Sequence, residues 1–188
     1  MSAPESAAAR PPSLPGDPPL AAETARMIRV DHAGEYGAVR IYDGQLAVLG
    51  RGRGHTAIRE MGEQEKRHLA VFEALVTARR VRPTVLQPLW HVAGFALGAA
   101  TALLGERAAM ACTVAVEEVI DEHYREQAER VGGSDPELAR TILSFRDDEL
   151  AHRRTALGHG AEDTPGYGLI SAVVKTGSRL AIWLSTRI

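Results

Sequence analysis

Two copies of a Glu-x-x-His step lie far apart in this sequence, and a lone glutamate precedes each of them. Residues three apart lie on one face of a helix, so each step presents a carboxylate beside an imidazole. Four carboxylates and two imidazoles in the order Glu, Glu-x-x-His, Glu, Glu-x-x-His are the ligands of a dinuclear iron or manganese site in a four-helix bundle. The candidate metal ligands are Glu35, Glu65, His68, Glu117, Glu149 and His152.

The intervals within this pattern also repeat. Glu35 precedes Glu65 by 30 residues, and Glu117 precedes Glu149 by 32. This similarity predicts two helical hairpins of one design that face each other across a pair of metal ions. Two divalent cations would cancel the charge of four carboxylates, whose burial without metal carries a large desolvation cost. Oxygen-rich ligation with few imidazoles suits iron or manganese better than copper.

Helical periodicity places both steps on apolar faces. Apolar residues recur at intervals of three and four around Glu65 and His68, and a similar stripe contains Glu149 and His152. The alternative is a solvated contact between Glu and His on a polar face. The apolar surroundings favour an inward position for all four residues.

The same test separates two adjacent glutamates. Glu117 shares a stripe with apolar residues, whereas Glu118 shares one with charged residues, so we expect Glu117 to point inward. Asp31 lies one turn before Glu35 on the same helical face. We expect its carboxylate to hold a ligating imidazole from behind.

Apolar periodicity and the positions of Gly and Pro predict the helices that carry these residues. No segment shows sustained period-two alternation, so we expect an all-α fold. The expected architecture is a ferritin-like four-helix bundle with additional apolar helical segments that associate with a membrane. The bundle helices are expected at residues 21–49, 56–80, 106–131 and 135–157, and a last helix at 167–185. Residues 85–104 form an apolar segment that we expect to be broken by Pro88, Gly94 and Gly98.

We expect one domain over residues 21–188, after a disordered tail rich in Pro and Ala at residues 1–20. That tail lacks the apolar core of a secretory signal and the several arginines of a transit peptide. The formal charge of −2 offers no basic surface, so no nucleic-acid partner is expected. The single cysteine, Cys112, permits neither an internal disulfide nor a cysteine-based zinc site, which favours a reducing compartment.

Several stretches are distinctive beyond the ligand pattern. They are RVDHAGEYGAVRIYDGQLAVLG from Arg29, EQEKRHL from Glu63, RPTVLQPLWHVAGFALGAATALLG from Arg82, AMACTVAVEEVIDEHY from Ala109 and FRDDELAH from Phe145. In these stretches the chain resembles the 5-demethoxyubiquinone hydroxylases, the di-iron monooxygenases of ubiquinone biosynthesis. The resemblance covers most of the chain from Arg26 to His152, and it implies the same six residues as iron ligands.

The resemblance implies hydroxylation of the ring of 5-demethoxyubiquinone (2-polyprenyl-3-methyl-6-methoxy-1,4-benzoquinone). The implied cofactors are two iron ions, with O2 as co-substrate and electrons from NADH or a reductase. No Gly-rich fingerprint follows a strand pattern, so the sequence does not support a Rossmann-type NADH site. Two alternatives use the same ligands: a ferritin-like protein that binds or oxidises iron, and a di-iron hydroxylase of another substrate. The apolar segment at residues 85–104 argues against a soluble iron store.

Tyr124 is the candidate catalytic residue besides the ligands. It lies two turns after Glu117 on the same stripe, from where it would orient the ring or relay a proton or an electron. The alternative is a core aromatic residue whose hydroxyl is satisfied. His123 and His32 are expected beside the site or on the surface rather than as ligands.

A substrate with a polyprenyl tail comes from a bilayer, so membrane lipid is an expected partner. Residues 85–104 are about long enough to span a bilayer, but their Pro and Gly content favours a segment that enters one leaflet. In residues 167–185, apolar residues such as Leu180 lie on one side and Lys175 and Arg179 on the other, as in an interfacial helix. The alternative for both segments is burial in the core or in a dimer interface.

We therefore expect a peripheral membrane protein on the cytoplasmic face of a bacterial inner membrane. Further candidate partners are a second copy of the chain, in a homo-oligomer, and a lipid-binding accessory protein of the ubiquinone pathway.

Overall fold

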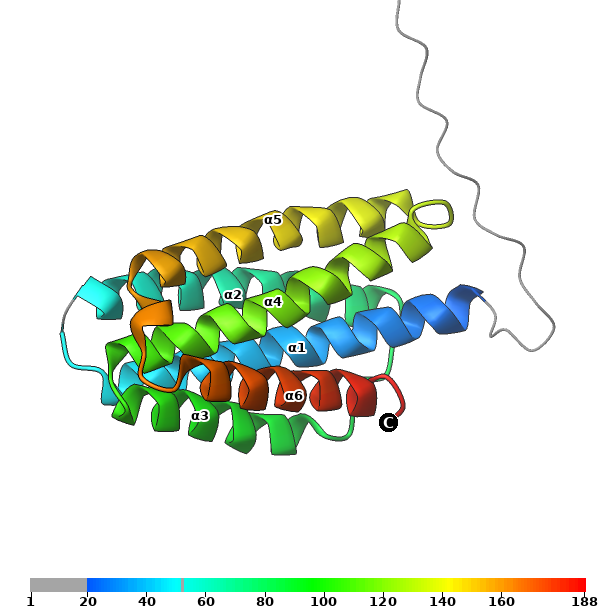
Figure 1. The fold of residues 1–188 in the computed structure, drawn as a ribbon. Coiled ribbons are helices and arrows are strands. Elements are labelled where there is room, and N and C mark those ends of the chain that lie inside the picture. The colour runs from blue at the N-terminus through cyan, green and yellow to red at the C-terminus, as the bar shows by residue number, and fades with distance from the viewer. Residues whose placement is uncertain (1–19, 52) are drawn as a thin grey trace, which may run out of the picture.

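The computed structural model describes residues 20–51 and 53–188, and the part it describes is helical, with no β-strand (Figure 1). The helices are α1 (Leu20–Val48), α2 (Arg53–Ala78), α3 (Gln87–Leu103), α4 (Glu106–Val131), α5 (Pro136–Gly158) and α6 (Tyr167–Ser185), with a 3-10 turn, η1 (Ala161–Asp163), before α6. The prediction of an all-α fold is confirmed. The predicted tail at residues 1–20 lies outside the described residues except for Leu20, so its disorder stays a prediction.

The helices repeat one plan along the chain. α1 packs against α2, and α4 packs against α5, so each pair forms an antiparallel hairpin (Figure 1). α3 then lies along α1, and α6 lies along α4. The two hairpins expected from the sequence are therefore present. Each hairpin also carries a third, apolar helix in the equivalent place.

Helix boundaries follow local signals. α5 begins with Pro136, whose missing N–H is no loss in a first turn. Asp135 caps this helix, because its carboxylate accepts a hydrogen bond from the Leu138 N–H at 3.1 Å. The predicted bounds of the four bundle helices lie within three residues of the observed ones, and those of α6 agree at both ends.

The prediction that Pro88, Gly94 and Gly98 break the apolar segment at residues 85–104 is wrong. α3 is continuous rather than broken. Pro88 lies in its first turn, where proline is tolerated. Gly94 and Gly98 are buried against α1, and a Cβ at Gly98 would collide with the carbonyl oxygen of Ile41. These glycines serve the close approach of two helix backbones and do not end the helix.

α4 lies at the centre of the molecule. Residues 108–117 are buried throughout, because α5, α6, α3 and α1 all pack against this helix. Many of these side chains are small, and Cys112 is among those with no exposed surface. The small side chains let several helices approach α4 from different sides.

The prediction that the apolar residues of α6 lie on one side of the helix is wrong, because these residues point in two directions. Val174 is buried beside Cys112 of α4, whereas Leu169, Val173 and Leu180 are 72%, 61% and 54% exposed. α6 therefore contributes to the core and to an apolar surface at once. None of the helices that the structure describes combines the length and the hydropathy required to span a bilayer.

Candidate metal centre

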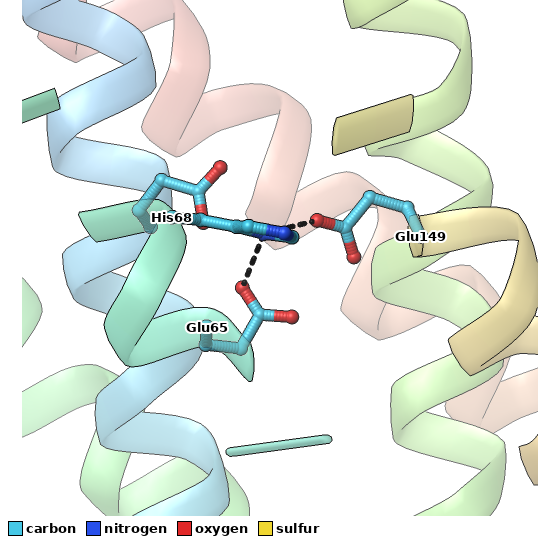
Figure 2. A group of neighbouring side chains, drawn as sticks. Glu65, His68 and Glu149 are labelled. Carbon is cyan, nitrogen blue, oxygen red and sulfur yellow. Dashed lines mark ion pairs between the residues drawn. The ribbon is translucent and has the colours of Figure 1, made fainter. Parts of the chain in front are cut away.

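The structure brings the six predicted ligands together inside the bundle. Every one of them is at most 3% exposed. They come from four helices: Glu35 from α1, Glu65 and His68 from α2, Glu117 from α4, and Glu149 and His152 from α5. Figure 2 shows the carboxylates of Glu65 and Glu149 both directed at the His68 ring. Residues far apart in the sequence therefore form one buried polar cluster.

Two overlapping groups can be distinguished within this cluster. The first group is Glu35, Glu65, His68 and Glu149, and the second is Glu65, Glu117, Glu149 and His152. Within each group, one ligand atom from every residue lies within 4.8 Å of the others. Glu65 and Glu149 belong to both groups. These two carboxylates could therefore contribute to two cation positions, while Glu35, His68, Glu117 and His152 would each contribute to one.

Unpartnered buried atoms indicate that the cluster suits cations. Glu35 Oε2, Glu65 Oε1 and His68 Nδ1 are buried and have no hydrogen-bond partner. His68 Nδ1 lies 3.1 Å from Glu149 Oε1 and 3.6 Å from Glu35 Oε2. Buried polar atoms without partners are costly, and a cation in each group would satisfy them. The donor set of oxygens with two imidazole nitrogens fits iron or manganese.

The pKa values of the cluster show how the carboxylates compete. Burial raises the pKa of Glu35 and of Glu117 well above the usual range, and the charges of Glu65 and Glu149 raise both further. For Glu65, burial is outweighed by contacts with His152 and His68, and the pKa falls to about 2. Without metal, the cluster therefore retains protons at some positions. Divalent cations can replace these protons and stabilise the ionised carboxylates.

Each histidine forms a hydrogen bond, through the ring nitrogen that points away from the carboxylates, with a residue of the opposite hairpin. His68 Nε2–H donates to Asp148 Oδ2 at 3.1 Å, and His152 Nε2–H donates to Gln64 Oε1 at 3.2 Å. Both acceptors directly precede a glutamate of the cluster. With Nε2 engaged in this way, Nδ1 of each ring faces the carboxylates, which outweigh the effect of burial and raise the pKa of both histidines. A metal would replace the proton at Nδ1 and take this nitrogen as a ligand.

Asp31 does not hold a ligating imidazole, contrary to our expectation. Its Oδ1 lies 3.3 Å from His123 Nε2 and accepts a hydrogen bond from Gln127 Nε2 at 2.8 Å. The reason is that Asp31 faces α4, whereas His68 and His152 come from α2 and α5. Helical spacing alone does not tell which helix lies opposite a residue.

Two tyrosines donate hydrogen bonds to Glu35 and Glu117, each from one hairpin to the glutamate of the other. Tyr42 of α1 donates a hydrogen bond to Glu117 of α4 at 3.0 Å, and Tyr124 of α4 donates to Glu35 of α1. Each tyrosine follows the glutamate of its own helix by seven residues. Tyr124 was a sequence-based candidate and Tyr42 was not, although the same two-turn spacing marks both.

A small cavity adjoins the carboxylate side of the cluster. It has a volume of about 30 Å³, and its wall includes all four glutamates of the cluster, Tyr124 and His123, but neither His68 nor His152. This volume suits a water molecule or a diatomic molecule. The cavity shares six wall residues with an apolar groove of about 470 Å³ that lies between α3 and α6. The shared residues are Val30, Gly34, Ala38, Val116, Ile120 and Ile182.

Glu118 lies outside the cluster, in agreement with the choice of Glu117 as the inward residue. Its carboxylate pairs with Arg153 at 2.9 Å and with Lys175 of α6. Arg179 of α6 pairs in the same way with Glu122 at 3.2 Å. The basic residues of α6 therefore attach this helix to α4.

Comparisons with known proteins agree on one family. The family described as ubiquinone biosynthesis protein COQ7 matches residues 22–185. The 3-demethoxyubiquinol 3-hydroxylase of Rhodospirillum rubrum is 56% identical over 176 residues, which is 93% of this chain and 83% of that protein. The human NADPH-dependent 3-demethoxyubiquinone 3-hydroxylase, mitochondrial, is 54% identical over 87% of this chain and 77% of its own length. The yeast 5-demethoxyubiquinone hydroxylase, mitochondrial, is 43% identical with the same two coverages.

Removal of a shared carboxylate should empty both metal positions. Glu65→Ala and Glu149→Ala are each expected to lose most of the bound iron or manganese, because both groups contain these residues. Glu117→Ala should lose metal chiefly from one position. Glu118→Ala is the matched control on the same helix and should retain full metal, since it breaks only partly exposed ion pairs. Elemental analysis by plasma mass spectrometry measures the result, and full occupancy in the Glu65→Ala or Glu149→Ala protein would contradict the assignment.

Proposed function

The chain belongs to the COQ7 family of ubiquinone biosynthesis proteins, and from this premise we propose how its cluster and groove serve the reaction. It is a hydroxylase, a monooxygenase that adds oxygen to the ring of a ubiquinone precursor. The function implied by the sequence resemblance is thereby confirmed. The observation that carries our proposal for the site is the shared wall between the carboxylate cavity and the apolar groove.

In this proposal, two iron ions bind at the six buried residues. Glu65 and Glu149 would contribute to both positions, Glu35 and His68 would complete one position, and Glu117 and His152 the other. Bound iron would supply the one-electron chemistry that activates dioxygen, which no protein side chain here can provide. Four helices carrying such a ligand set make a ferritin-like bundle the architecture that fits best.

The demethoxyubiquinone ring lies at the junction of groove and cavity in this proposal. Gly34, Ile120 and Ile182 form part of both walls, so a ring placed there faces the carboxylate side of the cluster. The small cavity suits dioxygen, and the apolar groove suits the first prenyl units. Tyr124 borders the cavity, where its hydroxyl can orient the ring. The apolar walls also exclude water from the reacting groups.

A reduced nicotinamide is the proposed electron source. Several relatives are named NADPH-dependent, whereas our sequence-based expectation was NADH or a reductase. The described residues contain no strand, so they offer no Rossmann-type dinucleotide site. A homo-oligomer and a lipid-binding accessory protein stay predictions from the sequence.

The exposed apolar residues support attachment to one leaflet of a membrane. We define the apolar surface by residues of two segments on either side of the groove: Val85, Leu89, Val92, Phe95, Leu103, Leu104, Leu169, Val173, Leu180 and Trp183. Arg187 stacks on the Trp183 ring at 4.2 Å, a pairing that suits the headgroup level. A prenyl tail that leaves the groove would pass directly into lipid. In a bacterial cell, we place the protein on the cytoplasmic face of the inner membrane.

Gly34 tests where the substrate lies. A Cβ at this position meets nothing within 4 Å, so Gly34→Ala should bind substrate and turn over normally. Gly34→Leu would fill the junction, and its turnover of demethoxyubiquinone should fall at least about tenfold, or about 1.4 kcal/mol in the barrier. Both changes favour a helix over glycine, so a loss of fold does not explain the difference. Equal turnover in the two iron-loaded variants, measured by mass spectrometry of the product, would contradict this placement.

Tyr124 and Tyr42 form a matched pair for a test of the catalytic role. Tyr124→Phe and Tyr42→Phe each remove one hydroxyl that donates to a cluster glutamate, but only Tyr124 borders the cavity. Turnover per bound iron should therefore fall more in Tyr124→Phe than in Tyr42→Phe. If both variants lose the same turnover per iron, Tyr124 only supports Glu35 and takes no further part.

Vesicle binding tests the apolar surface. The Val92→Glu/Trp183→Glu variant places charge on both segments without changing the groove wall. It should lose flotation with phospholipid vesicles and retain its iron and its turnover of a short-tailed substrate. Leu143→Glu is the control, because Leu143 is 42% exposed on α5, away from this surface. Undiminished flotation of the double variant would show that another surface meets the membrane.

A further inference from the structure

The support of the cluster differs between its two halves behind the histidines. The two tyrosines that donate to Glu35 and Glu117 are the same residue type in the same relation. Behind the histidines, however, one acceptor is the carboxylate of Asp148 and the other is the neutral amide of Gln64. Two nearly equivalent metal positions therefore differ by one charge behind the ligating ring.

This difference acts on the metal through the imidazole. A carboxylate that accepts the N–H of a ligating histidine makes the ring a stronger donor, and charge-assisted hydrogen bonds exceed neutral ones in strength. A neutral amide fixes the ring in the same way but polarises it less. The side chain of Asp148 is 39% exposed, so water screens its direct attraction for a cation. The hydrogen bond to His68 is then the main route of its effect.

The position of the His68 ring does not depend on Asp148 alone. The Phe145 ring stacks on it, with 4.0 Å between centroids and 21° between planes. Arg146, the cation two residues before Asp148 on α5, donates a hydrogen bond to Asp121 at 2.6 Å. A change of Asp148 to the isosteric Asn should therefore alter the charge behind the ring more than the place of the ring.

We propose that Asp148 is a positioning residue that makes the two metal positions unequal. The position completed by Glu35 and His68 binds its cation more tightly than the position completed by Glu117 and His152, and it fills first. This inference rests on the proposed two-metal site. It adds an order of filling, so that a chain with limiting metal carries its one cation at a defined place.

Isosteric exchange of the two acceptors tests the proposal. Manganese(II) is added at one equivalent to crystals of the metal-free wild type, and anomalous diffraction measures the occupancy of each position. The His68 position should hold most of the manganese. Asp148→Asn should weaken the first binding step about tenfold by calorimetry. The exchanged variant Gln64→Glu/Asp148→Asn should bind the first manganese at the His152 position instead.

The possible results separate this inference from the proposed function. Equal occupancy in the wild type, or an unchanged order in the exchanged variant, would overturn the order of filling while leaving the two-metal site intact. A wild type that binds no manganese and no iron would overturn both. If Asp148→Asn does not fold, Gln64→Glu alone decides. It should bring the two affinities closer by strengthening the second step, and an unchanged second step would refute the proposal.

Discussion

Four carboxylates enclosed in one helical core are the constraint on which the rest of this structure depends. Their mutual repulsion and their desolvation oppose folding, so every neighbouring group must offset them. Two imidazoles, two tyrosine hydroxyls and the proposed cations do so from different directions. The burial that makes the carboxylates costly also keeps water from them. An oxygen-activating site needs that exclusion.

The site is also shared between the two halves of the chain. Tyr42 of the first half holds Glu117 of the second, and Tyr124 of the second holds Glu35 of the first. The acceptors behind the histidines cross between the hairpins in the same way. Neither hairpin alone contains a complete set of supports. Correct docking of the halves is thus a condition for the geometry of every ligand.

The sequence predicted those features that depend on one helix at a time. Periodicity and terminal signals gave the bundle helices and the inward position of Glu117, because the face of a residue is a local property. The partner of Asp31 and the importance of Tyr42 depend on which helix lies opposite, which periodicity does not contain. Gly98 shows the same limit. Glycine has the same sequence signature whether it ends a helix or admits a neighbouring backbone.

The metal-ligand roles and the domain limits stay predictions of the sequence, although the six side chains lie together as that prediction requires. The wrong expectation for α6 has a similar cause. A helix with apolar residues on much of its circumference can contact core and lipid at once, and single-sided patterns do not describe it.

The glycine contacts between α3 and α1 have a mechanical consequence. Helices separated by a layer of side chains can slide as rotamers change, but the Gly98 backbone rests directly on that of Ile41. α3 and the helix that carries Glu35 therefore move as one body. The α6 wall of the groove is held to α4 partly by exposed ion pairs such as Arg179 with Glu122. If the groove widens to admit a bulky quinone, α6 must therefore move, while α3 stays in place against α1.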